Sequence, residues 1–465
     1  MGCAGHPDVK TPYLDTLASK GVRFENAYSA CPSCVPARAA LHTGLTQESH
    51  RRVGYADGIR WEYPHTMAGE LTKAGYYTQC VGKMHVDPLR NYLGFCHVEL
   101  HDGYLHYYRD PEIPYRENQK QADDYFHWLK QEKGIDCDVT DTGLECNSWV
   151  QDPGFMRRNT TPPLGDGPLH RFPARRDPDM PFFLFTSYLR PHPPFDAPQC
   201  YFDMYRNKEL TPPVVGDWCD EEALRARGRI FDSDTGPLDP ELVREMQIGY
   251  YACITHLDHQ IGRLIQALVE NKLYDDTIIL FVSDHGELLG DHHLFRKSRA
   301  YQGSSRVPFL VSGGGFRPEK PGSVKTDVVE LRDVMPTVLE AAGVQIPDSV
   351  EGISLWNTAL KESGTPEVRE YLHGEHTLGE ASSHWIITKT KNISGTPRPG
   401  EEQYFRIAED PDELHNLIGS ETAKERVEAL RGLLIQELQD REEGFVREGR
   451  LVTGCEPIVW LTKGK

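Results

Sequence analysis

At 465 residues, the chain is long enough for two domains, or for one large α/β domain with an appendage. Its net charge of −19 argues against a nucleic acid as partner, and no apolar run approaches the roughly 20 residues that span a bilayer. The 11 cysteines follow no framework spacing and no signal peptide is visible, so the sequence predicts a cytoplasmic protein.

Over the first 345 residues, helical periodicity alternates with short apolar runs, which is the pattern of an α/β fold. Because these runs are almost wholly apolar, we expect a large, mixed and mostly parallel buried sheet that is flanked by helices. Helices are predicted over 12–21, 66–75 and 240–270, and strands over 22–29, 76–82, 181–187, 277–283 and 306–312.

The last 120 residues, roughly, have a different pattern. Residues 384–390 and 402–407 are typical of short antiparallel strands, and 421–442 of an amphipathic helix. Residues 100–180 show little periodicity and are interpreted as a long surface excursion. We therefore predict a large α/β domain over 1–345 and a smaller α+β domain with an antiparallel sheet over 346–465.

The run from Cys34 to Gly44 is the most informative segment of the chain. Pro36 suits the first position of a helix, and Gly44 suits the residue just past its end. Cys34 would then lie at a helix N-terminus, where free N–H groups and the helix dipole favour an anion. Arg38 follows about one turn later and can point its guanidinium at the same place. The pattern predicts a nucleophilic side chain within an anion-binding site.

Polar side chains also follow three of the predicted strands. Ligands of open α/β sheets bind beyond the carboxyl ends of the strands, so we expect these groups to meet. A carboxylate beside an imidazole suits a divalent cation, although such a pair taken alone is more often a turn at a strand end. The groups are Lys83 and His85 after 76–82, His192 after 181–187, Asp284 and His285 after 277–283, and Lys297 in a basic loop further on.

The run at Cys34 closely resembles the signature of the type I sulfatases, C-x-P-[S/A]-R followed by a short spacer and T-G. Three other segments are similar to motifs of the same family, which belongs to the alkaline phosphatase superfamily. They are Gly82-Lys83-Met84-His85 (G-K-W-H), Pro191-His192-Pro193-Pro194 (P-H-x-P) and Asp284-His285-Gly286 (D-[N/H]-G). With Lys297, the motifs follow the family order, and the chain is identified as a member.

The resemblance implies a sulfuric ester hydrolase whose nucleophile is the hydrate of formylglycine, made from Cys34 by a maturation enzyme. It also implies a divalent metal ion, usually calcium with magnesium as the alternative. The implied metal ligands are Asp284, His285 and residue 34.

The resemblance also implies roles for the other motif residues. Lys83 and His85 would bond the formylglycine hydrate, and His85 would help to remove a proton. Arg38 would add to the positive charge, Lys297 would contact the sulfate oxygens, and His192 would protonate the departing alcohol.

The substrate is expected to be a sulfated carbohydrate or an aryl sulfate. Its pocket should come from 88–125 and 286–302, with a substrate-binding role for Arg296. Further aromatic or cationic candidates are His101, Tyr104, Tyr107 and Arg190.

One feature of the family is missing from this sequence. Sulfatases normally begin with an apolar strand that ends in Asp-Asp or Asp-Gln, and these residues are metal ligands. The sequence here begins at Met1-Gly2-Cys3, which looks like the segment just after that pair. We expect the first strand and its acidic ligands to be absent because the gene model is incomplete.

Two other functions fit part of the pattern. A phosphonate monoester or phosphodiester hydrolase shares the Cys34 run, but Gly82-Lys83-Met84-His85 favours sulfate. A glycan-binding protein without catalytic activity is suggested by the missing acidic pair.

Overall fold

The computed structural model describes residues 1–102, 123–134, 172, 176–226, 235–366, 368–390, 392–395 and 402–464. Most of the expected surface excursion at 100–180 lies outside these residues. Among the described residues, no helix combines the length and the apolar character needed to cross a membrane. Every cysteine in the same part of the chain is free.

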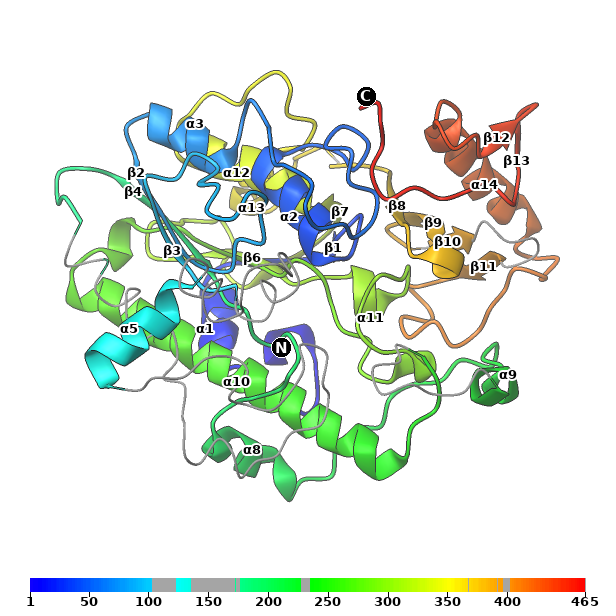
Figure 1. Cartoon of the computed structure of the whole chain (residues 1–465), viewed down its shortest axis with the longest axis horizontal. Helices are drawn as coiled ribbons and strands as arrows, with labels where there is room; N and C mark the ends of the chain where they lie inside the picture. The colour runs from blue at the N-terminus through cyan, green and yellow to red at the C-terminus, as the bar shows by residue number, and fades with distance from the viewer. Residues whose placement is uncertain are drawn as a thin grey trace.

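Helices flank the strands of the larger unit, and the long α10 (Pro240–Glu270) crosses the lower half of the view in Figure 1. Its bounds confirm the helix that the sequence predicts at 240–270. The helices that the structure describes before it are α1 (Pro12–Lys20), α2 (Cys34–Thr43), α3 (Met67–Lys73), α5 (Asp124–Lys133), α8 (Gln199–Arg206) and α9 (Glu221–Ala226). Those after it are α11 (Gln302–Ser305), α12 (Val334–Ala341), α13 (Trp356–Leu360) and α14 (Lys424–Leu438).

The described strands of the larger unit form two sheets. The first has the order β5-β6-β1-β7; in it β1 runs parallel to β7 and antiparallel to β6. The second has the order β3-β2-β4 and is parallel. Parallel strands with flanking helices confirm the predicted fold class. The strands are β1 (Val22–Tyr28), β2 (Tyr77–Gly82), β3 (His97–Leu100), β4 (Phe182–Ser187), β5 (Ile279–Val282), β6 (Phe309–Ser312) and β7 (Ser323–Glu330).

The expected C-terminal antiparallel sheet is also confirmed, with the order β11-β10-β9-β8. It lies beside β1 and β7 in Figure 1, and α14 covers it. The domain boundary at 345/346 stays a prediction. The strands of this part are β8 (Tyr371–His376), β9 (Ser383–Thr388), β10 (Asn392–Gly395) and β11 (Glu402–Phe405), followed by the hairpin β12 (Val446–Arg447) and β13 (Arg450–Leu451).

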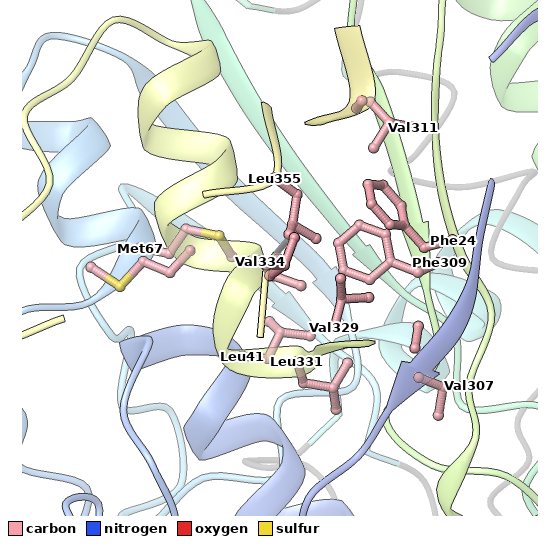
Figure 2. Packing of buried hydrophobic residues seen from close by; sticks show 14 of the residues in the cluster. Phe24, Leu41, Met67, Val307, Phe309, Val311, Val329, Leu331, Val334 and Leu355 are labelled. Atoms are coloured by element: carbon pink, nitrogen blue, oxygen red, sulfur yellow. The ribbon is translucent and has the colours of Figure 1, made fainter. Parts of the chain in front are cut away.

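A buried apolar cluster holds α2 against the first sheet (Figure 2). Phe24 of β1 and Phe309 of β6 meet edge to face, with ring centroids 5.4 Å apart. Leu41 of α2 packs into the same cluster with Leu331 and Val334. Because the C-terminal half of α2 is anchored in this way, its N-terminus is held at a fixed place beside the strand ends.

A cavity of about 1050 Å³ is lined by side chains of both β4 and β5. Among the described residues, β4 pairs only with β2, and β5 pairs only with β6. The sequence predicts both as buried strands, whereas they are half-buried in the structure. The reason is that each strand is the last of its sheet and borders the cavity.

The cavity leads to a prediction about stability when a strand is added. A chain extended ahead of Met1 by an apolar strand should unfold about 5 °C or more above the original chain. Such a strand would cover apolar side chains and pair with free strand edges, each of which is stabilising. Thermal unfolding monitored by circular dichroism measures the difference. An extension of equal length made of Gly and Ser is the control, and equal melting temperatures for both extensions would contradict the expectation.

Candidate active site

The N-terminus of α2 places Cys34 beside the ends of β2 and β5. The helix begins at Cys34, two residues earlier than predicted, so Pro36 is its third residue. A proline is tolerated there because the first N–H groups of a helix have no partner within it. Gly44 ends the helix with a φ of 69°, and a Cβ at this position would lie 2.7 Å from Cγ1 of Val350. Only glycine combines that backbone conformation with that space.

The thiol of Cys34 is buried among cationic groups. Its Sγ lies 3.1 Å from Nζ of Lys83 and 3.4 Å from Nε2 of His285. Burial by itself raises the pKa of this thiol, but Lys83, Lys297 and His285 together hold the pKa well below its ordinary value. A thiolate is therefore favoured at this position, and a nucleophilic oxygen anion in its place would be favoured for the same reason.

Arg38 joins the two sheets at this end of the cavity. Its Nε lies 3.1 Å from Oδ2 of Asp284, which follows β5. Its Nη1 donates to the carbonyl oxygen of Lys83 and to Oγ of Ser187, both at 2.9 Å. Lys83 follows β2, and Ser187 is the last residue of β4. Nε and Nη1 of the guanidinium thus fix the ends of three strands around Cys34.

Asp284, His285 and Cys34 form a cluster of possible metal ligands. One ligand atom of each lies within 4.8 Å of the other two. Nδ1 of His285 lies 2.8 Å from the carbonyl oxygen of Gly286, so this nitrogen carries a proton, and Nε2 is the ring atom that faces the sulfur of Cys34. Burial opposes ionisation of Asp284, but His285, Lys83 and Arg38 keep its pKa below the ordinary value. The carboxylate is therefore charged at neutral pH.

The donor set fits a divalent cation only in part. Calcium takes six to eight oxygen ligands in general, whereas this cluster offers one carboxylate, one imidazole and the side chain at position 34. Lys83 Nζ, 3.6 Å from Oδ2 of Asp284, adds a positive charge beside the same carboxylate. More anionic oxygen is needed for a complete calcium site than the described residues supply.

His192 and Lys297 also line the cavity at this end. Burial lowers the pKa of His192 well below its usual value, and the charge of Lys297 adds to the effect. Nδ1 of His192 lies 2.7 Å from the carbonyl oxygen of Pro193, so its proton is donated there and Nε2 is unprotonated. The loop of Lys297 is tied to the Cys34 segment, because Ser298 N donates to the carbonyl oxygen of Pro32.

His85 has a different partner from the one expected. Its Nε2 lies 3.1 Å from Oδ1 of Asp57, and no hydrogen bond to Cys34 is present among the described residues. The backbone at His85 has a positive φ of 55°, held by Asp102, which accepts hydrogen bonds from the N–H groups of Met84 and His85. The role of His85 stays a prediction.

The expected substrate-pocket residues are only partly brought to this site. Arg296 is not among the residues that line the cavity. Arg190 forms an ion pair with Asp196 and donates to the carbonyl oxygen of His192, so it supports the His192 loop. His101 is hydrogen-bonded to Asp123. Tyr104 and Tyr107 lie outside the described residues.

Sequence reasoning did not find Ser187, Asp57 or Asp102. Ser187 is the last residue of β4, and its position at a strand end was the one signal that could have identified it. Asp57 and Asp102 lie in irregular segments, where neither periodicity nor spacing marks them.

A nucleophile at a helix N-terminus, surrounded by cations at the strand ends of an α/β fold, defines a hydrolase of anionic esters. The sulfatase family model matches residues 1–344, and a model of the C-terminal region of N-sulphoglucosamine sulphohydrolase matches residues 290–441. The chain belongs to the sulfatase family, as its motifs predicted, and its class of reaction is the hydrolysis of sulfate esters.

The chain is also similar to individual proteins. The arylsulfatase of Clostridium perfringens (strain 13 / Type A) is 47% identical over 457 residues, which cover 98% of this chain and 94% of that protein. The choline-sulfatase of Rhizobium meliloti (strain 1021) is 30% identical over 414 residues, which cover 87% of this chain and 75% of that protein. The crystal structure of the phosphonate monoester hydrolase of Agrobacterium radiobacter has the same fold, with a TM-score of 0.74, 23% identity, and 94% and 93% of the two chains covered.

The metal ligands are tested by titrating the chain with calcium in a calorimeter. We expect Asp284→Asn to weaken binding by about tenfold or more, because the variant loses the one carboxylate of the cluster. Asp291→Asn is a matched control, since Asp291 is half-buried like Asp284 but lies outside the cluster. Equal calcium affinity for Asp284→Asn and the unchanged chain would contradict the assignment.

Proposed function

We propose that the chain hydrolyses an aryl sulfate to the phenol and inorganic sulfate, with residue 34 as formylglycine hydrate. The observation that carries this proposal is the environment of Cys34: Lys83 and His285 contact its sulfur, and Arg38 anchors the surrounding strand ends. The name of the Clostridium perfringens relative supports an aryl sulfate as substrate. A sulfated carbohydrate is the other substrate class that fits the sequence.

Formylglycine hydrate would supply two hydroxyl groups, one to attack sulfur and one whose deprotonation releases sulfate. A divalent cation held by Asp284, His285 and residue 34 would supply Lewis acidity beside that hydroxyl. The formylglycine-generating maturation enzyme as a partner and the cytoplasmic location are inferred from the sequence alone.

Two lysines of this chain would bind the sulfate group and the charge that builds on it, and Arg38 would add to the positive charge beside them. Lys83 is in contact with residue 34, and Lys297 lines the same end of the cavity. Arg38 fixes the carbonyl and carboxylate groups around them. Preorganised charges in a site with little water are the usual means of stabilising such a transition state. They also allow an anionic substrate to bind to a chain with a net charge of −19, since distant charges are screened within about 8 Å.

His192 would hold and deliver the proton of the leaving group. In the free chain its imidazole is neutral, because burial and Lys297 lower its pKa. A bound sulfate monoester brings a negative charge that offsets Lys297, which raises the pKa of His192 again. The Pro193 carbonyl keeps the proton on Nδ1, so the proton that reaches the alkoxide or phenoxide would leave from Nε2.

The alternatives remain distinguishable by direct assay. The fold likeness to a phosphonate monoester hydrolase supports parallel assays with an aryl sulfate and an aryl phosphonate monoester. We expect faster turnover of the sulfate. A binding protein without catalysis would turn over neither ester, although it could still bind sulfate.

The nucleophile is tested by mass spectrometry and by substitution. When the chain is produced with a maturation system, the tryptic peptide with residue 34 should carry an aldehyde. Cys34→Ala should lower kcat on an aryl sulfate by roughly 10⁴-fold or more, as removal of a nucleophile does in other hydrolases. Cys31→Ala, a buried cysteine on the same segment, is the control and should retain activity. Turnover that survives Cys34→Ala would overturn the proposal.

The role of His192 is tested by varying the leaving group. His192→Ala should lower kcat by about 10²–10⁴-fold for alkyl sulfates and much less for nitrophenyl sulfate, whose phenoxide needs little protonation. His256→Ala, which removes a half-buried histidine of α10, should affect both substrates alike. An equal loss on both substrates for His192→Ala would reject its role as the acid.

A further inference from the structure

The serine before Cys34 does not cap its helix. Ser33 is the N-cap residue of α2, with extended backbone angles, φ −149° and ψ 159°, but its side chain accepts no hydrogen bond from the helix. A serine at this position ordinarily accepts a hydrogen bond from the second or third N–H group of the helix. Oγ of Ser33 instead lies 2.8 Å from Nε2 of His376, and both side chains are buried.

His376 is held rigidly against the Cys34 segment. It is the last residue of β8, in the C-terminal sheet. The N–H of Glu375 donates to the carbonyl oxygen of Ala30, and the N–H of Thr377 donates to that of Val53, both at 2.8 Å. The backbone on each side of His376 is therefore fixed to the larger unit, and the imidazole is fixed against Ser33.

The state of the imidazole is also defined by its surroundings. Burial lowers the pKa of His376 to about 3, and Arg299, His285 and Lys297 contribute to the effect. The ring is therefore neutral, and its Nδ1 has no hydrogen-bond partner among the described residues. In either tautomer, the contact with Nε2 keeps the Ser33 hydroxyl away from the helix.

This contact decides which N–H groups stay free at the helix N-terminus. The third residue, Pro36, has no N–H group, and the N–H of Ala37 already donates to the carbonyl oxygen of Ser33. The N–H of Val35, the second residue, is thus the group that a capping Ser33 would take. With the hydroxyl turned away, the Val35 and Cys34 N–H groups have no partner within the helix and favour an anion beside Lys83.

We propose that His376 is a positioning residue of the active site: it holds the Ser33 hydroxyl off α2 and so keeps the Val35 N–H for the sulfate group at residue 34. The inference rests on the proposed function for the identity of the anion. It assigns the C-terminal sheet a part in anion binding.

The test is a cycle of variants in which two changes should cancel. In His376→Phe, Ser33 loses its partner and can cap the helix, so sulfate affinity should fall by about fivefold to tenfold. Ser33→Ala removes the competing hydroxyl and should change affinity less than about twofold. The double variant, Ser33→Ala with His376→Phe, should bind sulfate nearly as well as the unchanged chain, since nothing is left to occupy the Val35 N–H.

Binding of inorganic sulfate to the chain with unmodified Cys34 is measured by calorimetry, and KM and kcat for an aryl sulfate are measured on the matured enzyme. His376→Gln keeps a polar atom near the position of Nε2 and should restore sulfate affinity. Thermal unfolding of each variant reports whether it folds.

Two outcomes would overturn the inference. In the first, His376→Phe is folded and binds sulfate like the unchanged chain. In the second, the double variant stays as weak as His376→Phe, which would mean that His376 only packs. Failure of the proposed function would be separate, because an unchanged chain that does not hydrolyse aryl sulfate can still be compared with its variants in the sulfate titration.

Discussion

The active site depends on one buried guanidinium. Arg38 is bonded to the Asp284 carboxylate, the Lys83 carbonyl and the Ser187 hydroxyl, so a single side chain of α2 joins the ends of β5, β2 and β4. Removing one partner of a buried ion pair is far more costly than the pair itself is stabilising, because a charge is left unpaired. Since β4 and β5 do not pair with each other among the described residues, Arg38 and the contact of Lys83 with Asp284 are polar links between their sheets at this end of the cavity. The position of Cys34 relative to both sheets follows from those links.

The charges around Cys34 form a local positive site in an acidic chain. Lys83 contacts the sulfur, Lys297 lies near enough to lower the pKa of both Cys34 and His192, and Asp284 balances part of this charge. A bound anionic ester would neutralise the remaining positive charge. The cations that lower the pKa of His192 in the free chain would then lower it less, so the imidazole could be protonated when substrate is bound. In the proposed mechanism, substrate binding and proton transfer from His192 would thereby be coupled through one set of charges.

Much of the fold and the centre of the site could be predicted from the sequence. The helix at 240–270 was found with its bounds, because the helical spacing of apolar residues from Ile254 to Leu268 is a strong signal. Lys83, Asp284 and His285 were expected to meet because each motif follows a strand, and they do meet beside Cys34 at its helix N-terminus. The contact of His376 with Ser33 could not be predicted, since it joins residues 343 positions apart through the packing of two sheets. The half-buried state of β4 and β5 was missed because apolar runs do not reveal which strand is last in its sheet.

The C-terminal sheet is more than an appendage to the larger unit. Trp385 and Leu372 of that sheet share a buried cluster with Tyr28 of β1 and Val328 of β7, so the two parts have a common apolar core. The hydrogen bonds from Glu375 and Thr377 to the segments at Ala30 and Val53 extend this contact to the loops around α2. Because tightly packed cores move as units, a displacement of the C-terminal sheet would be transmitted to Ser33 and hence to the helix N-terminus that bears residue 34. The two family models overlap at residues 290–344, so neither model ends where the other begins.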